Sequence, residues 1–301
     1  MNKFENKFLT VSGKQRAFIK TKQFKTLWFN TGTLCNLTCK NCFMESSPTN
    51  DQLSYLSFEE FKNYIDESMV KNYGTKEVGF TGGEPFMNKD IIKMIEYSLK
   101  NGFNTLVLTN AMKPMLNKKE QLLNLKSSNL TIRVSIDHYK KEKHELIRGQ
   151  NSYDVMMVGL KWLNDNDFNY ALATRLLWNE KEDVVRKNFR VFTKNNKLNL
   201  DTNSKQHLVT FVEMDEKKDT PEITTECWGI LKKDPSNIMC SSSRMIVKKK
   251  GSKNTSVIAC TLLPYDNNFD LGKTLEESFK KIYLNHPHCS KFCVLGGSNC
   301  G

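Results

Sequence analysis

The sequence predicts an α/β fold, a partial (β/α)6 barrel with a small cysteine-rich C-terminal extension. Short apolar segments of the strand type alternate with segments of helical apolar periodicity along residues 25–215, which is typical of a parallel sheet covered by helices. Six such units are fewer than the eight of a closed barrel, so the barrel is expected to be open. Most of the nine cysteines come late in the chain, which sets its last part apart as an extension.

The expected elements follow in chain order. Ser57 and Glu60 form a capping-box pattern, and Phe58, Phe61 and Ile65 continue from it at helical spacing. Strands are expected at 26–31, 77–81, 105–109, 130–136, 170–176 and 207–212, and further helices at 89–100, 118–126, 153–164 and 182–194. A charged linker at 213–225 precedes a hairpin of strands at 244–249 and 257–259, and a helix is expected at 275–284.

These elements divide the chain into an N-terminal extension at 1–24, the partial barrel at 25–215 and the C-terminal extension at 216–301. A content of 39% hydrophobic and 26% charged residues is that of a globular protein. No apolar run approaches the roughly 18 residues of a membrane-spanning helix, so no membrane partner is expected. The first ten residues lack the apolar core of a secretory signal, and a cytoplasmic location is therefore expected.

The chain carries 45 basic and 33 acidic residues, a formal net charge of +12. A basic protein of this kind could bind nucleic acid, but its lysines are dispersed as on an ordinary solvated surface, so such a partner is not expected. The densest basic run, at 248–250, precedes Gly251 and fits an exposed hairpin. His138 and His144 lie in a lysine-rich stretch and are expected to face solvent.

Polar and cysteine residues follow the predicted strands where each strand ends. Cys35 follows the first strand and Gly82-Gly83-Glu84-Pro85 the second, while the later strand ends carry Asn110, then Ser135 with Asp137, and then Arg175. The carboxyl ends of parallel strands meet at one edge, where α/β proteins place their chemistry. These residues are therefore expected to surround one site.

Three cysteines, Cys35, Cys39 and Cys42, lie within eight residues. Three thiolates can hold three irons of a [4Fe–4S] cluster and leave the fourth iron without a protein ligand, although thiolates bind zinc equally well. A structural zinc site needs four ligands, usually as two pairs, and no fourth cysteine or histidine is close in sequence. The spacing therefore favours a cluster with one open position.

The segment Cys35-Asn36-Leu37-Thr38-Cys39-Lys40-Asn41-Cys42 resembles the CxxxCxxC signature of the radical S-adenosylmethionine (SAM) superfamily, and Gly82-Gly83-Glu84-Pro85 resembles its GGE motif. The resemblance implies that SAM binds the open iron and that an electron from the cluster cleaves it. The 5′-deoxyadenosyl radical so formed would take a hydrogen atom from a substrate. One departure is Asn41, which stands where the family has an aromatic residue near the adenine.

The resemblance also implies roles for the strand-end residues. The two glycines would let the backbone approach the ligand, and Glu84 would accept a hydrogen bond from the methionyl ammonium. Asp137 would accept one from a ribose hydroxyl, Arg175 would pair with the methionyl carboxylate, and Asn110 and Ser135 would lie beside the methionyl and ribose groups. The alternatives are a plain turn for 82–85, turn chemistry at Asn110, a loop or cap role for Asp137 and a surface ion pair for Arg175.

The six later cysteines resemble the SPASM/twitch extension of that superfamily, although their spacing departs from the full pattern. They are Cys227, Cys240, Cys260, Cys289, Cys293 and Cys300. Two fully thiolate-ligated clusters would need eight thiols, so one auxiliary iron–sulfur cluster is expected, held first of all by Cys240, Cys260, Cys293 and Cys300. A zinc site that holds the tail together and buried thiols without a metal are the alternatives.

The sequence thus predicts a radical SAM oxidoreductase or maturase that acts on a small-molecule or peptide substrate and takes electrons from a reduced flavodoxin- or ferredoxin-type donor. Two other hypotheses remain at this point. A zinc-bearing nucleic-acid-binding protein would explain the charge and the cysteines, and a non-catalytic iron–sulfur protein would hold a cluster without cleaving SAM.

Overall fold

Six parallel strands form the wall of an open barrel in the computed structural model, which describes residues 2–212 and 219–296. They are β2 (Thr26–Asn30), β3 (Glu77–Thr81), β4 (Asn104–Thr109), β5 (Leu130–Ser135), β6 (Asn169–Leu176) and β7 (Leu208–Val212). Each lies beside the next in chain order. The predicted fold class is confirmed, and all six predicted strands are present within one or two residues of their predicted bounds.

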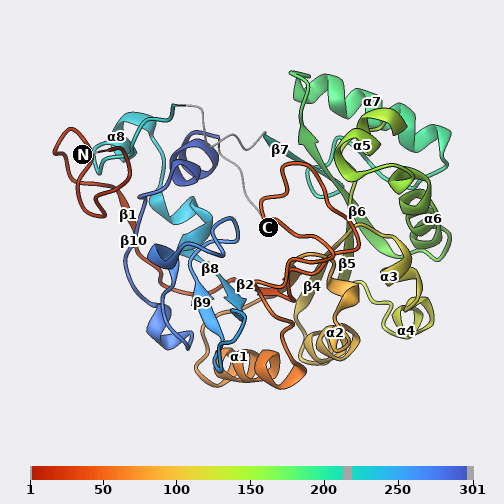
Figure 1. Cartoon of the computed structure of the whole chain (residues 1–301), viewed down its shortest axis with the longest axis horizontal. Helices are drawn as coiled ribbons and strands as arrows, with labels where there is room; N and C mark the ends of the chain where they lie inside the picture. Colours follow the sequence, from red (N-terminus) through yellow and green to blue (C-terminus); the bar gives the residue numbers. More distant parts are fainter. Residues whose placement is uncertain (1, 213–218, 297–301) are drawn as a thin grey trace.

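Helices cover the outside of this sheet (Figure 1). They are α1 (Phe58–Val70), α2 (Ile91–Lys100), α3 (Lys113–Leu116), α4 (Lys119–Asn124), α5 (Lys141–Arg148), α6 (Ser152–Asp165) and α7 (Glu182–Asn195). Strand β5 shows how the two faces differ. Ile132 and Val134 belong to the core packed between sheet and helices, whereas Arg133 and Ser135, pointing the other way, line the inside of the barrel.

Two strands of the C-terminal part extend the same sheet. Strand β8 (Ser243–Val247) pairs in parallel with β2, and β9 (Ser256–Ile258) pairs antiparallel with β8, which gives an eight-stranded sheet. Around it lie the short helices α8 (Cys227–Leu231), η2 (Pro235–Asn237), η3 (Met239–Ser241) and η4 (Asn267–Phe269), and the π-helical η6 (Cys289–Leu295). The predicted hairpin is present.

One predicted helix is wrong, and the helix α5 was not predicted. The helix expected at 275–284 is a single turn, η5 (Glu276–Ser278), followed by strand β10 (Ile282–Tyr283). Two histidines expected to face solvent lie in α5 or just before it. His138 and His144 are buried, because the apolar stripe of α5 turns His144 inward toward Tyr153, and His138 stacks on Tyr139.

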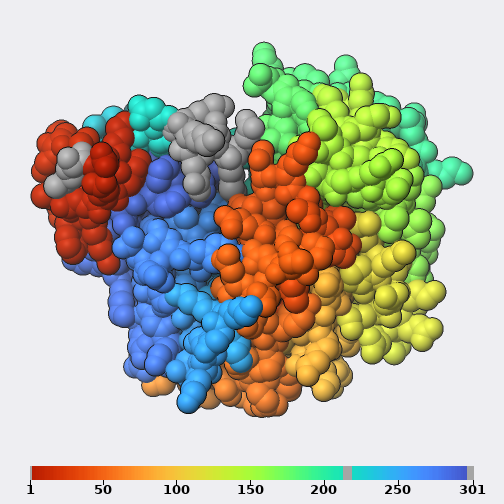
Figure 2. All heavy atoms as spheres, viewed as in Figure 1, coloured from red at the N-terminus to blue at the C-terminus, as the bar shows by residue number. Residues whose placement is uncertain are grey.

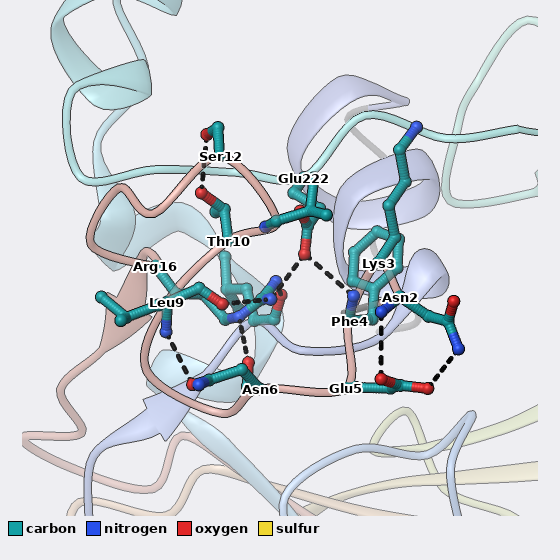
Figure 3. A network of polar contacts seen from close by, with 12 residues as sticks. Asn2, Lys3, Phe4, Glu5, Asn6, Leu9, Thr10, Ser12, Arg16 and Glu222 are labelled. Atoms are coloured by element: carbon teal, nitrogen blue, oxygen red, sulfur yellow. Dashed lines mark hydrogen bonds and ion pairs between the residues drawn. The ribbon is translucent and has the colours of Figure 1, made fainter.

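The N-terminal residues are fastened to the C-terminal part of the chain. Strand β1 (Phe18–Ile19) pairs antiparallel with β10. The buried Arg16 guanidinium forms an ion pair of 2.5 Å with Glu222, whose carboxylate also accepts hydrogen bonds from the backbone N–H of Phe4 and of Val11 (Figure 3). The predicted extension at 1–24 therefore packs against the region that follows the barrel.

The segment between β2 and α1 carries the first three cysteines. It lies between the C-terminal part (blue) and helices α5 to α7 (green) on the face seen in Figure 2. Among the described residues, no helix combines the length and the apolar character needed to cross a membrane.

Candidate functional site

A cavity of about 210 Å³ opens at the carboxyl ends of the barrel strands. It brings together most of the predicted site residues, namely Cys35, Cys39, Cys42, Gly82, Gly83, Asn110, Ser135, Asp137 and Arg175. Glu84 and Pro85 are not among its lining residues. The lining also includes residues from the C-terminal part, Thr261, Leu262 and Phe292, so the barrel and its extension enclose the cavity jointly.

The cysteine loop is held at several points. The backbone N–H of Cys35 donates to the carbonyl of Ser47 at 3.0 Å, and that of Lys40 donates to Ile147 in α5 at 2.8 Å. Asn41 has φ 54°, a left-handed conformation that asparagine tolerates better than an aromatic residue does. The backbone at Asn41 thus gives a physical reason for the departure from the family motif. Phe43, 42% exposed, also lines the cavity.

The chemistry of this loop fits an iron–sulfur cluster. Burial raises the pKa of the Cys35 thiol to about 12 and also raises that of Cys39, so without a cation these side chains are neutral. A bound metal reverses this preference because it stabilises the thiolate directly. Across residues 2–212 and 219–296, no three Cys, His, Asp or Glu side chains converge closely enough to hold a single metal ion. In a cluster, each thiolate binds its own iron.

The two glycines keep the strand-end loop close to the cysteine loop. A Cβ on Gly83 would lie 2.2 Å from the carbonyl oxygen of Leu34, and one on Gly82, where φ is +132°, would lie 2.4 Å from that of Gly32. No side chain fits in either space. Glycine is therefore required because this loop packs against the backbone just before Cys35. The loop at 82–83 supports the cysteine loop and also lines the cavity.

Glu84 is fully buried behind the cavity wall. Its carboxylate accepts hydrogen bonds from the Thr109 hydroxyl at 2.9 Å, from the Asn110 backbone N–H at 2.8 Å and from the Phe86 backbone N–H at 3.1 Å. Burial raises the pKa of Glu84 to about 7 against the effect of these bonds. The side chain thus ties the end of β3 to the end of β4, and the contact expected with a methionyl ammonium stays a prediction. Pro85 starts the short helix η1 (Pro85–Met87) and is buried.

Asp137 lies at the centre of an ion-pair network. It is 1% exposed and accepts from Arg148 Nε at 2.7 Å and from Arg175 Nε at 2.7 Å and Nη2 at 3.0 Å. Burial alone raises the pKa of Asp137, but the charges and hydrogen bonds of the two arginines outweigh it and hold the pKa well below its ordinary value. Asp137 and Arg175 bind each other, and the contacts expected with the ribose and the methionyl carboxylate stay predictions.

Arg175 connects this network to the cysteine loop, and Asn110 connects the end of β4 to the same loop. Arg175 Nη1 donates to the carbonyl of Asn41 at 3.0 Å, and the Asn110 side-chain amide donates to Asn36 Oδ1 at 2.9 Å. The same amide lies 3.9 Å from the sulfur of Cys35. The strand ends therefore position the loop as well as surrounding the cavity.

Four of the later cysteines line a second, small cavity. They are Cys240, Cys260, Cys289 and Cys293, which come from η3, the loop after β9 and the π-helical η6. Burial raises the pKa of Cys240 to about 12 and that of Cys289 well above its ordinary value. Leu262 lines both cavities, so only a thin wall separates them. Cys289, a second-rank candidate from the sequence, belongs to this group.

Two of the predicted metal ligands are not in this group. Cys227 lies at the start of α8, where its sulfur accepts from the Thr224 backbone N–H at 3.3 Å, and it does not line the cavity. Cys300 lies outside the described residues. Sequence reasoning also missed Arg133, a cavity-lining residue whose signal was a charged side chain in the alternating pattern of β5.

Comparisons with known proteins agree with this geometry. The radical SAM superfamily matches residues 29–184. The antilisterial bacteriocin subtilosin biosynthesis protein AlbA of Bacillus subtilis (strain 168) is 31% identical over 160 residues, 51% of this chain and 34% of that protein. This chain spans less than half the length of the curated relatives it matches.

Two solved structures share the fold. Streptococcus suis SuiB bound to S-adenosylmethionine has a TM-score of 0.61 at 13% identity, covering 83% of this chain and 63% of that one. A histidine-tagged form of anSMEcpe with bound AdoMet has a TM-score of 0.62 at 16% identity, covering 85% and 77%. Because the superfamily match covers more than half of the sequence, the chain belongs to the radical SAM superfamily.

Proposed function

We propose that this protein cleaves SAM reductively at a [4Fe–4S] cluster held by Cys35, Cys39 and Cys42, and modifies a peptide or small-molecule substrate in the adjoining cavity. The observation that carries the proposal is the shared lining of one cavity by these three cysteines and by the carboxyl ends of β3 to β6. When bound, the cluster and SAM supply the electron and the 5′-deoxyadenosyl radical that abstracts a hydrogen atom.

The chain's own residues would bind and shield the reacting groups. The three thiolates hold three irons, and the 82–83 loop with the polar ends of β4 and β5 offers hydrogen-bonding groups beside them. Leu37, Met44 and Leu262 supply apolar wall, which limits the entry of water to a reactive site. Arg175 and Arg148 place positive charge at the rim, suited to a methionyl carboxylate, although Arg175 would first have to share its bonds to Asp137.

A peptide is the substrate that the relatives favour. AlbA is a bacteriocin biosynthesis protein, and MftC of Mycolicibacterium smegmatis, 24% identical over 151 residues, is a mycofactocin maturase. Other relatives act on smaller molecules by name, such as the Fe-coproporphyrin III synthase of Methanosarcina barkeri. We further propose one auxiliary iron–sulfur cluster in the second cavity and a flavodoxin- or ferredoxin-type electron donor.

The basic run at 248–250 does not favour nucleic acid. Lys248 pairs with Glu60, Lys249 with Asp270 and Lys250 with Asp51, so acidic neighbours already neutralise the positive charge of this run.

The zinc hypothesis for the C-terminal cysteines predicts a colourless protein containing zinc, and the iron–sulfur proposal predicts a brown one containing iron.

The test is anaerobic reconstitution with iron and sulfide, addition of SAM and a reductant, and mass spectrometry for 5′-deoxyadenosine. We expect release by the parent protein, none by Cys35→Ala, and parent-like release by the control Val70→Ala, whose side chain is 82% exposed on α1. A parent protein that holds its clusters and releases none would contradict the proposal and would indicate an electron-transfer role.

A further inference from the structure

Three uncharged polar side chains that line the site cavity are buried without a hydrogen-bond partner. They are the indole N–H of Trp28 on β2, the hydroxyl of Ser46 in the segment after the three cysteines, and the hydroxyl of Thr261 in the C-terminal part. None of them has a partner within residues 2–212 and 219–296. A buried polar group without a partner costs free energy, and folded proteins keep few of them. Three such groups around one cavity therefore point to a ligand.

The surroundings of these groups are apolar. Trp28 belongs to a hydrophobic cluster shared by the barrel and the C-terminal part, and so do the cavity-lining residues Met44, Leu262 and Phe292. The charged residues that line the cavity in the described chain all come from a different stretch, residues 133–175. A ligand group that meets the three polar side chains is thus placed among apolar ones, where an unpaired charge would be costly.

The barrel makes room for the indole of Trp28. Side chains alternate along β2, so Leu27 and Phe29 pack in the core between sheet and helices, while Trp28 turns into the barrel. A Cβ on Gly79, the residue paired with Trp28 on β3, would lie 2.5 Å from the indole ring. The ring occupies the space that a side chain at position 79 would fill, and this packing fixes the indole in the cavity wall.

The two hydroxyls come from beside the two groups of cysteines. Ser46 follows Cys42 by four residues, and Thr261 directly follows Cys260. A serine or threonine hydroxyl can donate and accept a hydrogen bond, whereas an indole N–H only donates. Either hydroxyl can turn about its Cα–Cβ bond between staggered rotamers without movement of the backbone. The three groups therefore offer donors for an oxygen atom and acceptors for an N–H.

We propose that this part of the cavity wall binds an uncharged amide of the substrate. The Trp28 indole donates to a carbonyl oxygen, and the Ser46 and Thr261 hydroxyls bond to a carbonyl oxygen or to an amide N–H. An amide carries an acceptor and a donor without charge, whereas a carboxylate lacks the N–H and brings a charge into apolar surroundings. The inference rests on the proposed function, because it names the chemical group that the substrate of the same cavity presents.

The test is thermal unfolding of the anaerobically reconstituted holoprotein, with and without SAM, at increasing concentrations of three probes. N-acetylglycine N-methylamide carries the secondary amides of a peptide backbone, acetamide carries a primary amide, and sodium acetate is the charged analogue of acetamide. Sodium chloride keeps the ionic strength equal. A ligand that binds the folded state raises Tm as its occupancy rises. With SAM present, we expect an amide to raise Tm more than acetate does.

The two amide probes separate two sources of the same chemistry. A larger rise in Tm with N-acetylglycine N-methylamide assigns a peptide-backbone amide. A larger rise with acetamide assigns a primary amide, as in a side chain or a small molecule. Each response is taken as the difference between parent and variant, which removes general effects of the probe on the solvent.

Substitutions of similar size locate the effect. Thr261→Val removes one hydroxyl and Trp28→Phe removes the indole N–H, so each should lose the extra rise in Tm with the amide. Because the Thr261 hydroxyl has no partner to lose, Thr261→Val should keep or raise the Tm of the protein without probe. Thr255→Val is the matched control. The Thr255 hydroxyl is buried outside the cavity and bonds to Tyr64 at 2.7 Å, so its loss should lower Tm without probe and leave the amide response as in the parent.

Three results would overturn the inference. One is the same amide response in the parent and in Thr261→Val, which holds even where Trp28→Phe does not fold. Another is a response to acetate as large as that to the amides. The third is an amide response seen only without SAM, which would assign the three polar groups to SAM itself.

The outcome is separable from that of the proposed function. Release of 5′-deoxyadenosine by a parent protein without an amide response would remove only the assignment of the substrate group. An amide response without such release would remove only the SAM chemistry.

Discussion

The two groups of cysteines are built in different ways. Cys35, Cys39 and Cys42 come from one loop of eight residues after β2, and the strand ends around them hold that loop in place. Cys240, Cys260, Cys289 and Cys293 come from three separate segments of the C-terminal part and meet only when it folds. The first group is a local motif on a rigid barrel, and the second depends on tertiary structure. This difference predicts how each group responds to mutation.

The largest expected effect is a difference in 5′-deoxyadenosine release between variants of the two cysteine groups. Cys39→Ser should abolish 5′-deoxyadenosine release under strong chemical reductant, because the loop loses one of three ligands to the site that binds SAM. Cys289→Ser should retain measurable release in the same assay, because it lies in the second cavity. The measurement is mass spectrometry of the reconstituted proteins. Loss of 5′-deoxyadenosine release in both variants would show that SAM cleavage needs both cysteine groups.

The second prediction compares the iron content of two cysteine variants within the C-terminal part. Cys240→Ser should lower iron by about four per chain, the content of one [4Fe–4S] cluster. Cys227→Ser should leave iron unchanged, because its sulfur lies at the start of α8 and outside the second cavity. Iron analysis after anaerobic desalting checks both. An equal loss in the two variants would place Cys227 among the ligands.

The third prediction concerns the ion-pair network beneath the cysteine loop. Asp137→Asn leaves Arg148 and Arg175 without their buried partner and should cost about 3–5 kcal/mol of unfolding free energy. Because the pKa of Asp137 is lowered on folding, its contribution is present above the ordinary aspartate pKa and is lost as pH falls through the lowered value. Urea unfolding at pH 7 and at pH 3 checks this. A difference between variant and parent that is the same at both pH values would contradict it.

The fourth prediction compares a crowded glycine with an open one. Gly83→Ala should destabilise the protein by about 1–3 kcal/mol and weaken cluster binding, because its Cβ would meet the backbone of Leu34. Gly229→Ala in α8 is the matched control, since nothing lies within 4 Å of the position of its Cβ and alanine favours a helix. Unfolding curves and the iron content of the two variants measure these effects. Equal effects of the two changes would show that space at Gly83 is not limiting.

The smallest expected effect lies in the N-terminal attachment. Glu222 is buried, which raises its pKa, but hydrogen bonds from Val11, Phe4 and Arg16 lower it below the ordinary value. Glu222→Gln should therefore cost about 1–3 kcal/mol at neutral pH, and the difference should shrink as pH falls below about 4.3. Denaturant titrations across that range measure it. The iron content of the reconstituted Glu222→Gln protein should equal that of the parent.

Much of this fold could be predicted because its signals are local. The strand β3 is predicted to the residue, and the capping box at Ser57 and Glu60 is present with both hydrogen bonds. The cysteine loop and the glycine pair are motifs whose chemistry depends on neighbours in sequence. By contrast, β10 was mistaken for a helix because two residues pair with β1 more than 260 positions earlier, and no local pattern reports such a pairing.

The sequence indicated where the site residues lie, while the contacts they make within the chain depend on tertiary structure. The strand ends do surround one cavity, but Glu84, Asp137 and Arg175 are occupied by contacts that depend on the exact spacing of β3 to β6. Asp137 is bound by an arginine from α5, a helix hidden in a polar stretch, and so its network could not be anticipated. Cys289 was ranked below Cys293 for the same reason, since the π-helical turn that brings both into one cavity has no simple sequence signature.

The attachment of Arg16 has a consequence for the order in which the protein folds. Its guanidinium bonds to Glu222 and to the carbonyl of Leu284, 268 residues further along the chain. During synthesis Arg16 must therefore stay hydrated until the ribosome has released nearly all of the barrel and its extension. Contacts of such long separation form slowly, so closure at Arg16 is expected to be a late event in maturation, after the barrel is complete.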